Sequence, residues 1–165
     1  MGGFSIYAKE IMSKINTKKF KKTLSKFITG VTVVCVKANE TIYGKTVNSF
    51  NSLSLNPPLV LFSLGNYSSS INVYLKTKYL TINILSKQQK DISNHFSSKN
   101  PKAKKIKFLD SQNNTSFIRD CVANLKCKLV NKIKKGDHVI FICEVVDVKH
   151  NDKLKPLSYF NSKYN

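Results

Sequence analysis

A run of short hydroxyl and amide side chains stands between apolar segments in the first half of the chain. It extends from Gly44 to Pro58, reads GKTVNSFNSLSLNPP, and closes on a double proline. Apart from Lys45, its polar residues are small and uncharged, and no helical spacing of apolar residues runs through it. Such a segment can present several hydrogen-bond donors and acceptors to a planar ligand with polar edges. On composition alone it is also consistent with a polar strand followed by a loop.

Two shorter motifs could contribute to the same kind of site. Residues 85–89, Leu-Ser-x-x-Gln, predict the end of a strand and then a helix that Ser86 caps. Residues 136–138, Gly-Asp-His, predict a tight turn that carries the imidazole of His138. Each motif alone is explained equally well by ordinary local structure, so neither identifies a function by itself.

The chain lacks the sequence signatures of several common enzyme sites. It contains no G-x-G-x-x-G dinucleotide fingerprint, no phosphate-binding P-loop and no G-x-S-x-G nucleophile elbow. The three histidines, His95, His138 and His150, are scattered and have no carboxylate at metal-ligand spacing. We therefore predict no metal site and no Rossmann-type domain.

The charge of the chain is strongly positive. Lysine and arginine number 28 against 9 acidic residues, which gives a formal net charge of +19. Arg119 is the only arginine, whereas proteins that read bases or phosphates usually favour the bidentate guanidinium group. We therefore expect nonspecific attraction to polyanions as a side effect of the charge, and no specific nucleic-acid function.

Length and cysteine usage indicate one domain in a reducing compartment. The 165 residues suffice for a single core. No apolar run approaches the roughly 20 residues that span a membrane, and the lysine-rich residues 1–22 lack a secretory signal. Buried free thiols are favoured over a zinc site or a disulfide for Cys35, Cys121, Cys127 and Cys143. We therefore expect a soluble cytoplasmic protein that does not enter the membrane.

The spacing of apolar residues predicts few helices. One helix is predicted over 17–29, with Thr17 as its N-cap and Gly30 at its end. Its apolar stripe consists of Phe20, Leu24, Phe27 and Ile28. Shorter helices are predicted over 68–75 and 86–96.

Strands are predicted where β-branched and apolar residues run continuously or alternate. They cover residues 31–36, 42–49, 59–64, 80–85, 121–130, 139–148 and 157–160. Turns are predicted at 39–40 and 134–137, and residues 97–116 are predicted to form a long surface loop that is ordered only near 106–109. Strands that outnumber helices and run mainly as hairpins favour an antiparallel β-barrel with a few peripheral helices.

Taken together and in this order, the motifs resemble those of the flavin reductase family that supplies reduced flavin to two-component monooxygenases. The matching blocks are FITGVTVV at 27–34, G-x-TVNSF-x-SLSL-x-PPLVL at 44–61, NILS-x-x-Q at 83–89, GDH at 136–138 and PL-x-YF at 156–160. The resemblance covers roughly residues 20 to 164. We assign residues 1–16 to an N-terminal extension and residues 17–165 to one flavin reductase-like domain.

The resemblance implies a mainly β fold, an antiparallel split β-barrel, that binds FMN or FAD at a homodimer interface. The family's binding positions fall on Thr46, Val47, Asn48, Ser49, Ser52, Leu53, Ser54, Ser86 and Gln89. The first seven would meet the isoalloxazine edge and the ribityl phosphate. Ser86 and Gln89 would hold the phosphate end, where a helix start favours an anion. His138, the candidate catalytic residue, would orient or polarise the nicotinamide.

The implied activity is that of an NAD(P)H:flavin oxidoreductase, which passes reduced flavin to a separate monooxygenase. The resemblance leaves open the choice between FMN and FAD and between NADH and NADPH. Lys45 stands where the family commonly has an apolar residue, so it either points to solvent or places a cation near a cofactor; Cys143 stands where glycine is common. Two alternatives remain, namely a non-catalytic barrel that holds flavin or haem and a basic polyanion-binding protein.

Overall fold

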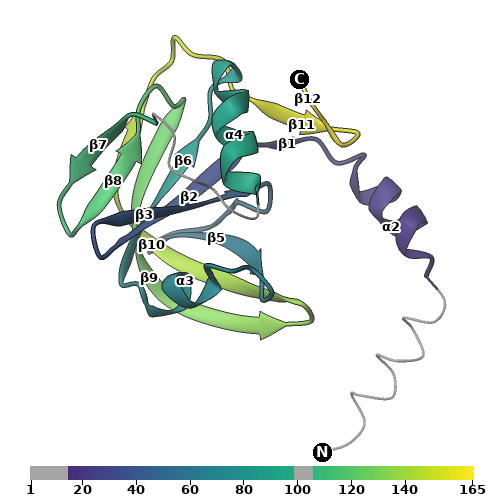
Figure 1. Cartoon of the computed structure of the whole chain (residues 1–165), viewed down its shortest axis with the longest axis horizontal. Coiled ribbons are helices and arrows are strands. Elements are labelled where there is room, and N and C mark those ends of the chain that lie inside the picture. The colour runs from purple at the N-terminus through teal and green to yellow at the C-terminus, as the bar shows by residue number, and fades with distance from the viewer. Residues whose placement is uncertain (1–14, 99–105) are drawn as a thin grey trace, which may run out of the picture.

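The computed structural model describes residues 15–98 and 106–165 (Figure 1). The strands are β1 Thr29–Gly30, β2 Thr32–Ala38, β3 Thr41–Val47, β4 Asn51–Leu55, β5 Pro58–Gly65, β6 Tyr79–Ile84, β7 Phe108–Ser111, β8 Thr115–Ile118, β9 Ala123–Lys135, β10 His138–His150, β11 Ser158–Phe160 and β12 Lys163–Tyr164. The helices are α2 Thr17–Leu24, α3 Ile71–Lys76 and α4 Lys90–Ser97, the last preceded by the 3-10 turn η1 Lys87–Gln89. Most of the predicted N-terminal extension lies outside the described residues.

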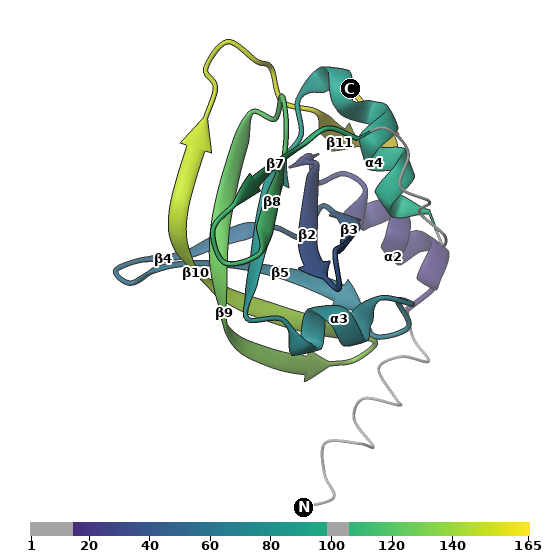
Figure 2. The ribbon, with the colours of Figure 1, turned by 60° about the vertical axis from the view of Figure 1, so that its left-hand side comes forward.

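Seven strands form one antiparallel sheet in the order β3-β2-β6-β9-β10-β5-β4. The sheet curls around a core (Figure 2). Its two edge strands, β3 and β4, follow each other directly in the chain. Ser49, between these strands, donates its hydroxyl to the Ser63 carbonyl over 3.1 Å and accepts the Ser63 N–H over 3.0 Å. The Ser49 hydroxyl thus binds the backbone N–H and carbonyl of Ser63, as a neighbouring strand would, at the point where the chain passes from β3 to β4. The predicted mainly β, split-barrel fold is confirmed.

The interior of the barrel is filled by every second residue of its strands, the ones whose side chains face inward. In β5, Val60, Phe62 and Leu64 are buried while their neighbours are half-buried, as the two-residue period of a strand requires. The ring of Phe62 stacks on that of Phe141 with centroids 5.0 Å apart. Tyr74 of α3 is fully buried and donates its hydroxyl to the Val34 carbonyl over 2.8 Å. Helix α3 is therefore anchored to β2 by this side chain.

A second core lies between β2 and α4. Its buried members are Val31, Val33, Cys35, Leu85, Phe96, Ile118, Cys121 and Leu157. Because the two cores share β2, that strand is buried on both faces, in agreement with its continuous apolar sequence. Phe96 of α4 packs directly over the backbone of Gly44 in β3. The absence of a side chain at Gly44 therefore sets how closely α4 approaches the barrel.

The predicted loop over 97–116 is wrong in its second half. Residues 108–118 form the hairpin β7–β8, and all of β8 is buried. Asn83 holds this hairpin in place, because its side-chain oxygen accepts the backbone N–H of Ile118 over 3.0 Å. The lysine-rich residues 99–105 lie outside the described part of the chain. The contact with Asn83 and the burial of Ile118 in the second core together fix β8, and the long-range polar contact leaves no periodic pattern in the sequence.

The helix predicted over 17–29 is shorter in the structure, and it ends before the last two residues of the predicted apolar stripe. Helix α2 ends at Leu24, Asn16 rather than Thr17 caps it by accepting the Lys19 N–H over 3.0 Å, and the chain then enters β1. The stripe residues remain exposed, from 51% for Phe20 to 75% for Phe27. The stripe is present, but no other segment of the described chain covers it.

The remaining predicted elements are confirmed, with shifts of a few residues at their ends. The turn at 39–40 separates β2 from β3, and the turn predicted over 134–137 is confined to residues 136–137, because β9 continues to Lys135. The strand predicted over 157–160 is β11, and it pairs with β1 and with the additional strand β12. None of the helices within residues 15–98 and 106–165 is long and apolar enough to cross a lipid bilayer.

The four cysteines are free and buried, as predicted. Burial raises the pKa of Cys121 and of Cys143 to about 12, and it raises the pKa of Cys35 and of Cys127 further. Only the thiolate reacts with disulfide reagents. These thiols are therefore protected both by burial, which excludes the reagent, and by their protonation. We expect no rapid reaction of the native protein with Ellman's reagent at mildly alkaline pH, and reaction of all four cysteines after unfolding in guanidinium. Rapid titration of one native thiol would contradict this packing.

Candidate functional site

The first part of the hydroxyl–amide run borders a cavity at one end of the barrel. Thr46 and Val47 come from the end of β3, and Asn48 follows directly. Together with Val31, Ser93, Ser97, Tyr159 and Tyr164 they line a cavity of about 270 Å³. The walls are thus supplied by β3, by α4 and by the β11–β12 hairpin. The structure brings these three predicted site residues together.

Some polar groups at this first cavity are already hydrogen-bonded within the chain, and others are not. The hydroxyl of Thr46 donates to the Ser93 carbonyl over 2.7 Å, which ties β3 to α4. Asn48 is exposed, and residues 48–50 make no backbone-to-backbone hydrogen bond within the described chain. Thr46 therefore fixes the wall, while the Asn48 amide and the backbone N–H groups of residues 48–50 can bind a ligand.

The second part of the run forms an edge strand rather than a loop. Ser52, Leu53 and Ser54 lie on β4, which pairs with β5 on one side and shows an irregular register between Ser52 and Ser54. Ser52 and Leu53 are exposed and Ser54 is half-buried. None of the three lines the first cavity. Within one chain they face solvent, and the Ser49 hydroxyl is engaged by Ser63.

Ser86 and Gln89 border a different cavity, of about 480 Å³, at the start of η1 and α4. The Gln89 side chain accepts the Ser86 N–H over 3.0 Å and donates to the Arg119 carbonyl over 2.6 Å. Both ends of its amide are therefore used by the fold. Arg119 and Lys107 line the same cavity with positive charge, and Asp120 beside them contributes one negative charge. Sequence reasoning assigned no role to Arg119, although its being the only arginine was a signal.

His138 lies away from both cavities, at the start of β10 opposite Gly65 of β5. Its Nδ1 is 2.6 Å from a carboxylate oxygen of Asp137, and because a carboxylate only accepts, the ring nitrogen donates. This hydrogen bond lowers the pKa of Asp137. The ring edge of Tyr67 meets the imidazole at a centroid distance of 6.3 Å. The imidazole is oriented on one side and is 42% exposed, so it can meet a ligand from solvent.

One buried polar group near the first cavity has no partner. The hydroxyl oxygen of Thr29 is buried and makes no hydrogen bond within the described residues. Thr29 pairs with Tyr159, whose side chain lines the first cavity. Because this oxygen is closed to solvent and Thr29 does not line the cavity, it is not a contact for a ligand there. The exposed Asn48 amide and the backbone N–H groups of residues 48–50 fit a flat ligand with hydrogen-bonding edges, such as a flavin.

Comparisons with known proteins identify the family of the chain. The family model described as "Flavin reductase like domain" matches residues 24–165. The FMN reductase (NADH) SmoA of Agrobacterium fabrum is 33% identical over 137 residues, which cover 83% of this chain and 79% of the relative. The reductase component of the 4-hydroxyphenylacetate 3-monooxygenase of Thermus thermophilus is 30% identical and covers 88% of this chain and 93% of its own.

Solved structures give the same result. The flavin reductase PheA2 in its native state superimposes with a TM-score of 0.85 at 36% identity, covering 92% of this chain and 97% of the other. The NADH:FAD oxidoreductase SgcE6 of Streptomyces globisporus, in complex with NAD and FAD fragments, gives 0.86 at 25% identity over 91% and 92%. The family-model match, over residues 24–165, spans the barrel. The chain belongs to the family of proteins with a flavin reductase like domain.

Proposed function

We propose that the protein is an NAD(P)H-dependent flavin reductase that supplies reduced FMN or FAD to a separate monooxygenase. The observation that carries the proposal is the family match over residues 24–165, together with the free hydrogen-bond donors of residues 48–50. Relatives named as FMN reductase (NADH) and as reductase components of monooxygenases support it. The absence of a Rossmann fingerprint is consistent with it, because the barrel itself would bind both nucleotides.

The first cavity would receive the polar edge of the flavin ring. A bound flavin supplies the redox chemistry, because its N5 accepts the hydride that leaves C4 of the nicotinamide. The chain's task is to hold both rings in contact and to exclude water. Asn48 and the backbone of residues 48–50 would bind the ring edge, while Ser49, Ser52, Leu53 and Ser54 would extend that surface along β4. Thr46 and Val47 would fix the wall behind it.

Ser86 and Gln89 are proposed to shape the phosphate end of the site. Gln89 is held between the Ser86 N–H and the Arg119 carbonyl, so it fixes the start of the helix rather than offering a free amide. The N–H groups of Ser86, Lys87 and Gln89 are already bonded within the chain, so an anion here would depend on the side chains that line the cavity. Arg119 and Lys107 would add charge-assisted hydrogen bonds to a phosphate in the same cavity.

His138 is proposed to position the nicotinamide. Ser49 is bonded to Ser63, Ser63 lies two residues before Gly65 on β5, and Gly65 faces His138. His138 therefore lies one strand over from β5, two residues along from the Ser63 that holds Ser49 in the hydroxyl–amide run. With its Nδ1 held by Asp137, the imidazole presents Nε2 to solvent, where it can donate to or accept from an amide.

The reductase is proposed to act as a homodimer. Five large apolar residues near the N-terminal helix are each more than half exposed, namely Ile15, Phe20, Leu24, Phe27 and Ile28. Leu55, at the tip of the β4–β5 hairpin, is 93% exposed. An apolar stripe of this extent normally marks a contact surface. A second copy that packs against α2 would cover this stripe, whereas the β4 hairpin that carries Leu55 projects from the opposite side of the barrel (Figure 2).

The dimer can be tested at Leu24, which is 56% exposed and therefore contributes little to the core of one chain. We expect the wild-type protein to have twice the 18.7 kDa mass of the chain by light scattering, and Leu24→Asp to shift it toward the monomer. The matched control is Thr23→Asp, which introduces the same charge at an exposed neighbouring position. A monomeric wild-type protein, or an equal effect of both substitutions, would contradict this assignment of the interface.

A cytoplasmic location is proposed as well, because the four buried free thiols suit a reducing compartment. The activity itself is tested by steady-state oxidation of NADH and NADPH with FMN, FAD and riboflavin as acceptors. We expect oxidation that requires both the protein and added flavin. Bound flavin without oxidation of either nicotinamide nucleotide would favour the non-catalytic barrel instead.

A further inference from the structure

A third cavity lies on the outer face of the large sheet, beside the β7–β8 hairpin (Figure 1). Cys127 belongs to the core of the barrel, so Lys126, the residue before it on β9, points to the outer face. The cavity has a volume of about 590 Å³ and shares no lining residue with the two cavities of the candidate site. Its lining consists of Asp110, Ser111, Gln112, Lys126, Val146 and Asp147.

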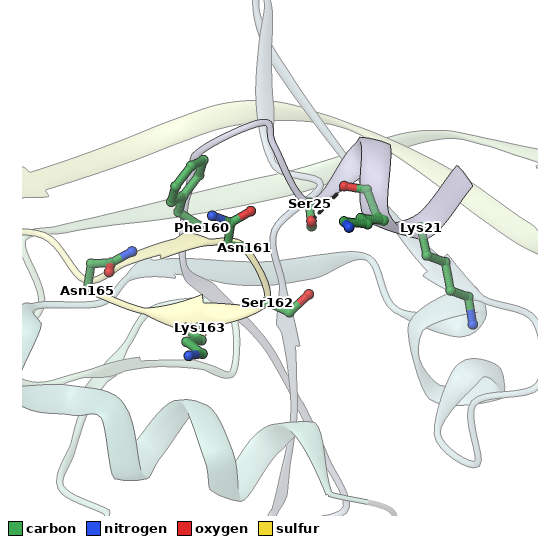
Figure 3. A pocket seen from close by; sticks show the side chains of 8 residues that line it. Lys21, Ser25, Phe160, Asn161, Ser162, Lys163 and Asn165 are labelled. Atoms are coloured by element: carbon green, nitrogen blue, oxygen red, sulfur yellow. Dashed lines mark hydrogen bonds between the residues drawn. The ribbon is translucent and has the colours of Figure 1, made fainter. Parts of the chain in front are cut away.

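Lys126 is buried in the wall of this cavity without a partner. It is only 7% exposed, although a buried lysine is normally paired. No carboxylate of the described chain lies within 4.0 Å of its ammonium group, which also makes no hydrogen bond there. Polar side-chain atoms that are closed to solvent and lack a partner occur, within the described residues, only at Thr29 and His95, so the Lys126 ammonium reaches the cavity. By contrast, Lys21 and Lys163, at the cleft between α2 and the β11–β12 hairpin, are exposed (Figure 3).

Asp147 faces Lys126 across the pairing of β9 with β10, yet the two charges do not form an ion pair. The register of the two strands shifts between Val145 and Asp147, with Val146 as the additional residue. A bulge of this kind changes the direction of the side chains around it. Asp147 is exposed and makes no hydrogen bond within the described part of the chain. The bulge therefore leaves a cation and an anion next to each other, each able to bind a ligand group.

Asp110 supplies a second carboxylate, so two of the nine acidic residues of the chain line this cavity. Its Oδ1 accepts the Ser116 hydroxyl over 2.7 Å and lies 4.0 Å from Lys37 Nζ, whereas its Oδ2 has no partner in residues 15–98 and 106–165. Thr81, opposite Lys126 on β6, donates its hydroxyl to the Ser116 carbonyl over 2.8 Å. The hairpin is thus fixed beside Lys126, and one oxygen of Asp110 remains available.

We propose that this cavity binds a free amino acid with a cationic side chain, such as arginine. A simple anion would meet two carboxylates and a simple cation would meet the lysine, so a ligand that suits the cavity carries charges of both signs. Arginine has two cationic groups and one carboxylate, which match the two carboxylates and one ammonium group of the cavity. Its carboxylate would lie beside Lys126, and its α-ammonium and guanidinium groups beside Asp110 and Asp147. The Ser111 hydroxyl and the Gln112 amide can bind the same groups.

Calorimetric titration with L-arginine, agmatine and L-citrulline tests the choice of ligand. Agmatine lacks the carboxylate, and citrulline lacks the charge of the side chain. We expect arginine to bind at one site per chain, and each analogue to bind at least roughly tenfold more weakly, the effect of losing one charge-assisted hydrogen bond. The absence of saturable arginine binding, or equal binding of all three compounds, would overturn the proposal.

Two substitutions test the site itself. Lys126→Met keeps the buried stem and removes the charge, and Lys128→Met, at an exposed position two residues along β9, is the matched control. We expect Lys126→Met to weaken arginine binding at least roughly tenfold and agmatine binding not at all, because agmatine has no carboxylate for the lysine. Lys128→Met should bind arginine like the wild type. Unchanged arginine binding in Lys126→Met, or an equal loss in the control, would contradict the site.

Asp147→Asn keeps the test decisive if Lys126→Met does not fold, because Asp147 is exposed and contributes little to the core. We expect this variant to unfold at the wild-type temperature and to bind both arginine and agmatine at least roughly tenfold more weakly. Arginine binding at the wild-type Kd would overturn the proposal. These titrations need neither flavin nor a nicotinamide nucleotide, so their outcome is independent of the proposed function.

Discussion

Replacing Gly44 by alanine is expected to displace helix α4 and to remove flavin binding. The added methyl group would overlap Cδ1 and Cε1 of the Phe96 ring and lie 2.8 Å from its Cγ. Phe96 is 4% exposed and packed within the second core, so its ring cannot move aside freely. Overpacking of this kind costs about 1–3 kcal/mol of the free energy of unfolding. In a chain of this size, we expect the melting temperature to fall by about 2–4 °C for each kcal/mol.

Loss of flavin binding follows because α4 is part of both cavities of the candidate site. Ser93 and Ser97 of α4 line the first cavity, and Ile92 of α4 lines the second. A shift of the helix would also break the hydrogen bond between Thr46 and Ser93. Thermal unfolding and flavin titration measure the two effects. Gly30→Ala is the matched control, because nothing lies within 4 Å of the added methyl there. Equal behaviour of the two variants would contradict this packing.

Replacing His138 by asparagine is expected to lower kcat/KM for the nicotinamide nucleotide while leaving flavin binding intact. The imidazole lies apart from the cavity of Thr46 and Asn48, so its removal leaves the groups that would hold the flavin edge. If it orients the nicotinamide, the substitution misplaces the hydride donor. A misplacement of about 1 Å can reduce the rate by up to roughly 100-fold. We expect a loss between about 10-fold and 100-fold, which would show in single-turnover reduction of bound flavin.

The chain provides a close control for this substitution. His150 lies at the opposite end of β10, is exposed, and has a carboxylate oxygen of Asp152 at 3.8 Å from its Nε2. His150→Asn therefore removes a comparable histidine–carboxylate pair from the same strand. We expect its kinetics to match those of the wild type. If His138→Asn also reduces flavin at the wild-type rate, His138 has no positioning role.

The sequence predicts the strands well where burial alone determines them. Strand β2 is apolar on both faces because two cores flank it, and its continuous β-branched run predicts this directly. The hairpin β7–β8 could not be predicted in the same way. Its position depends on Asn83, which accepts the Ile118 N–H and donates to the Val33 carbonyl. Such long-range polar contacts leave no periodic trace in the sequence.

The candidate site was predictable in part. Thr46, Val47 and Asn48 meet at one cavity, as the continuity of the run suggested. Gln89 belongs to a recognisable motif, yet its amide is consumed by the Ser86 N–H and the Arg119 carbonyl, so the motif encodes a helix start as much as a binding site. The predicted apolar stripe is only partly helical, because Phe27 and Ile28 follow the end of α2 at Leu24, and the sequence does not tell which surface covers it.

The central claim is that the protein passes a hydride from a nicotinamide nucleotide to a flavin. Anaerobic stopped-flow absorbance at the oxidised flavin band tests it most directly, with protein and FMN or FAD mixed against NADH or NADPH. We predict rapid, protein-dependent bleaching with at least one pair of nucleotides, and the faster pairs would also rank the cofactors. Bound flavin that stays oxidised with both NADH and NADPH would contradict the claim.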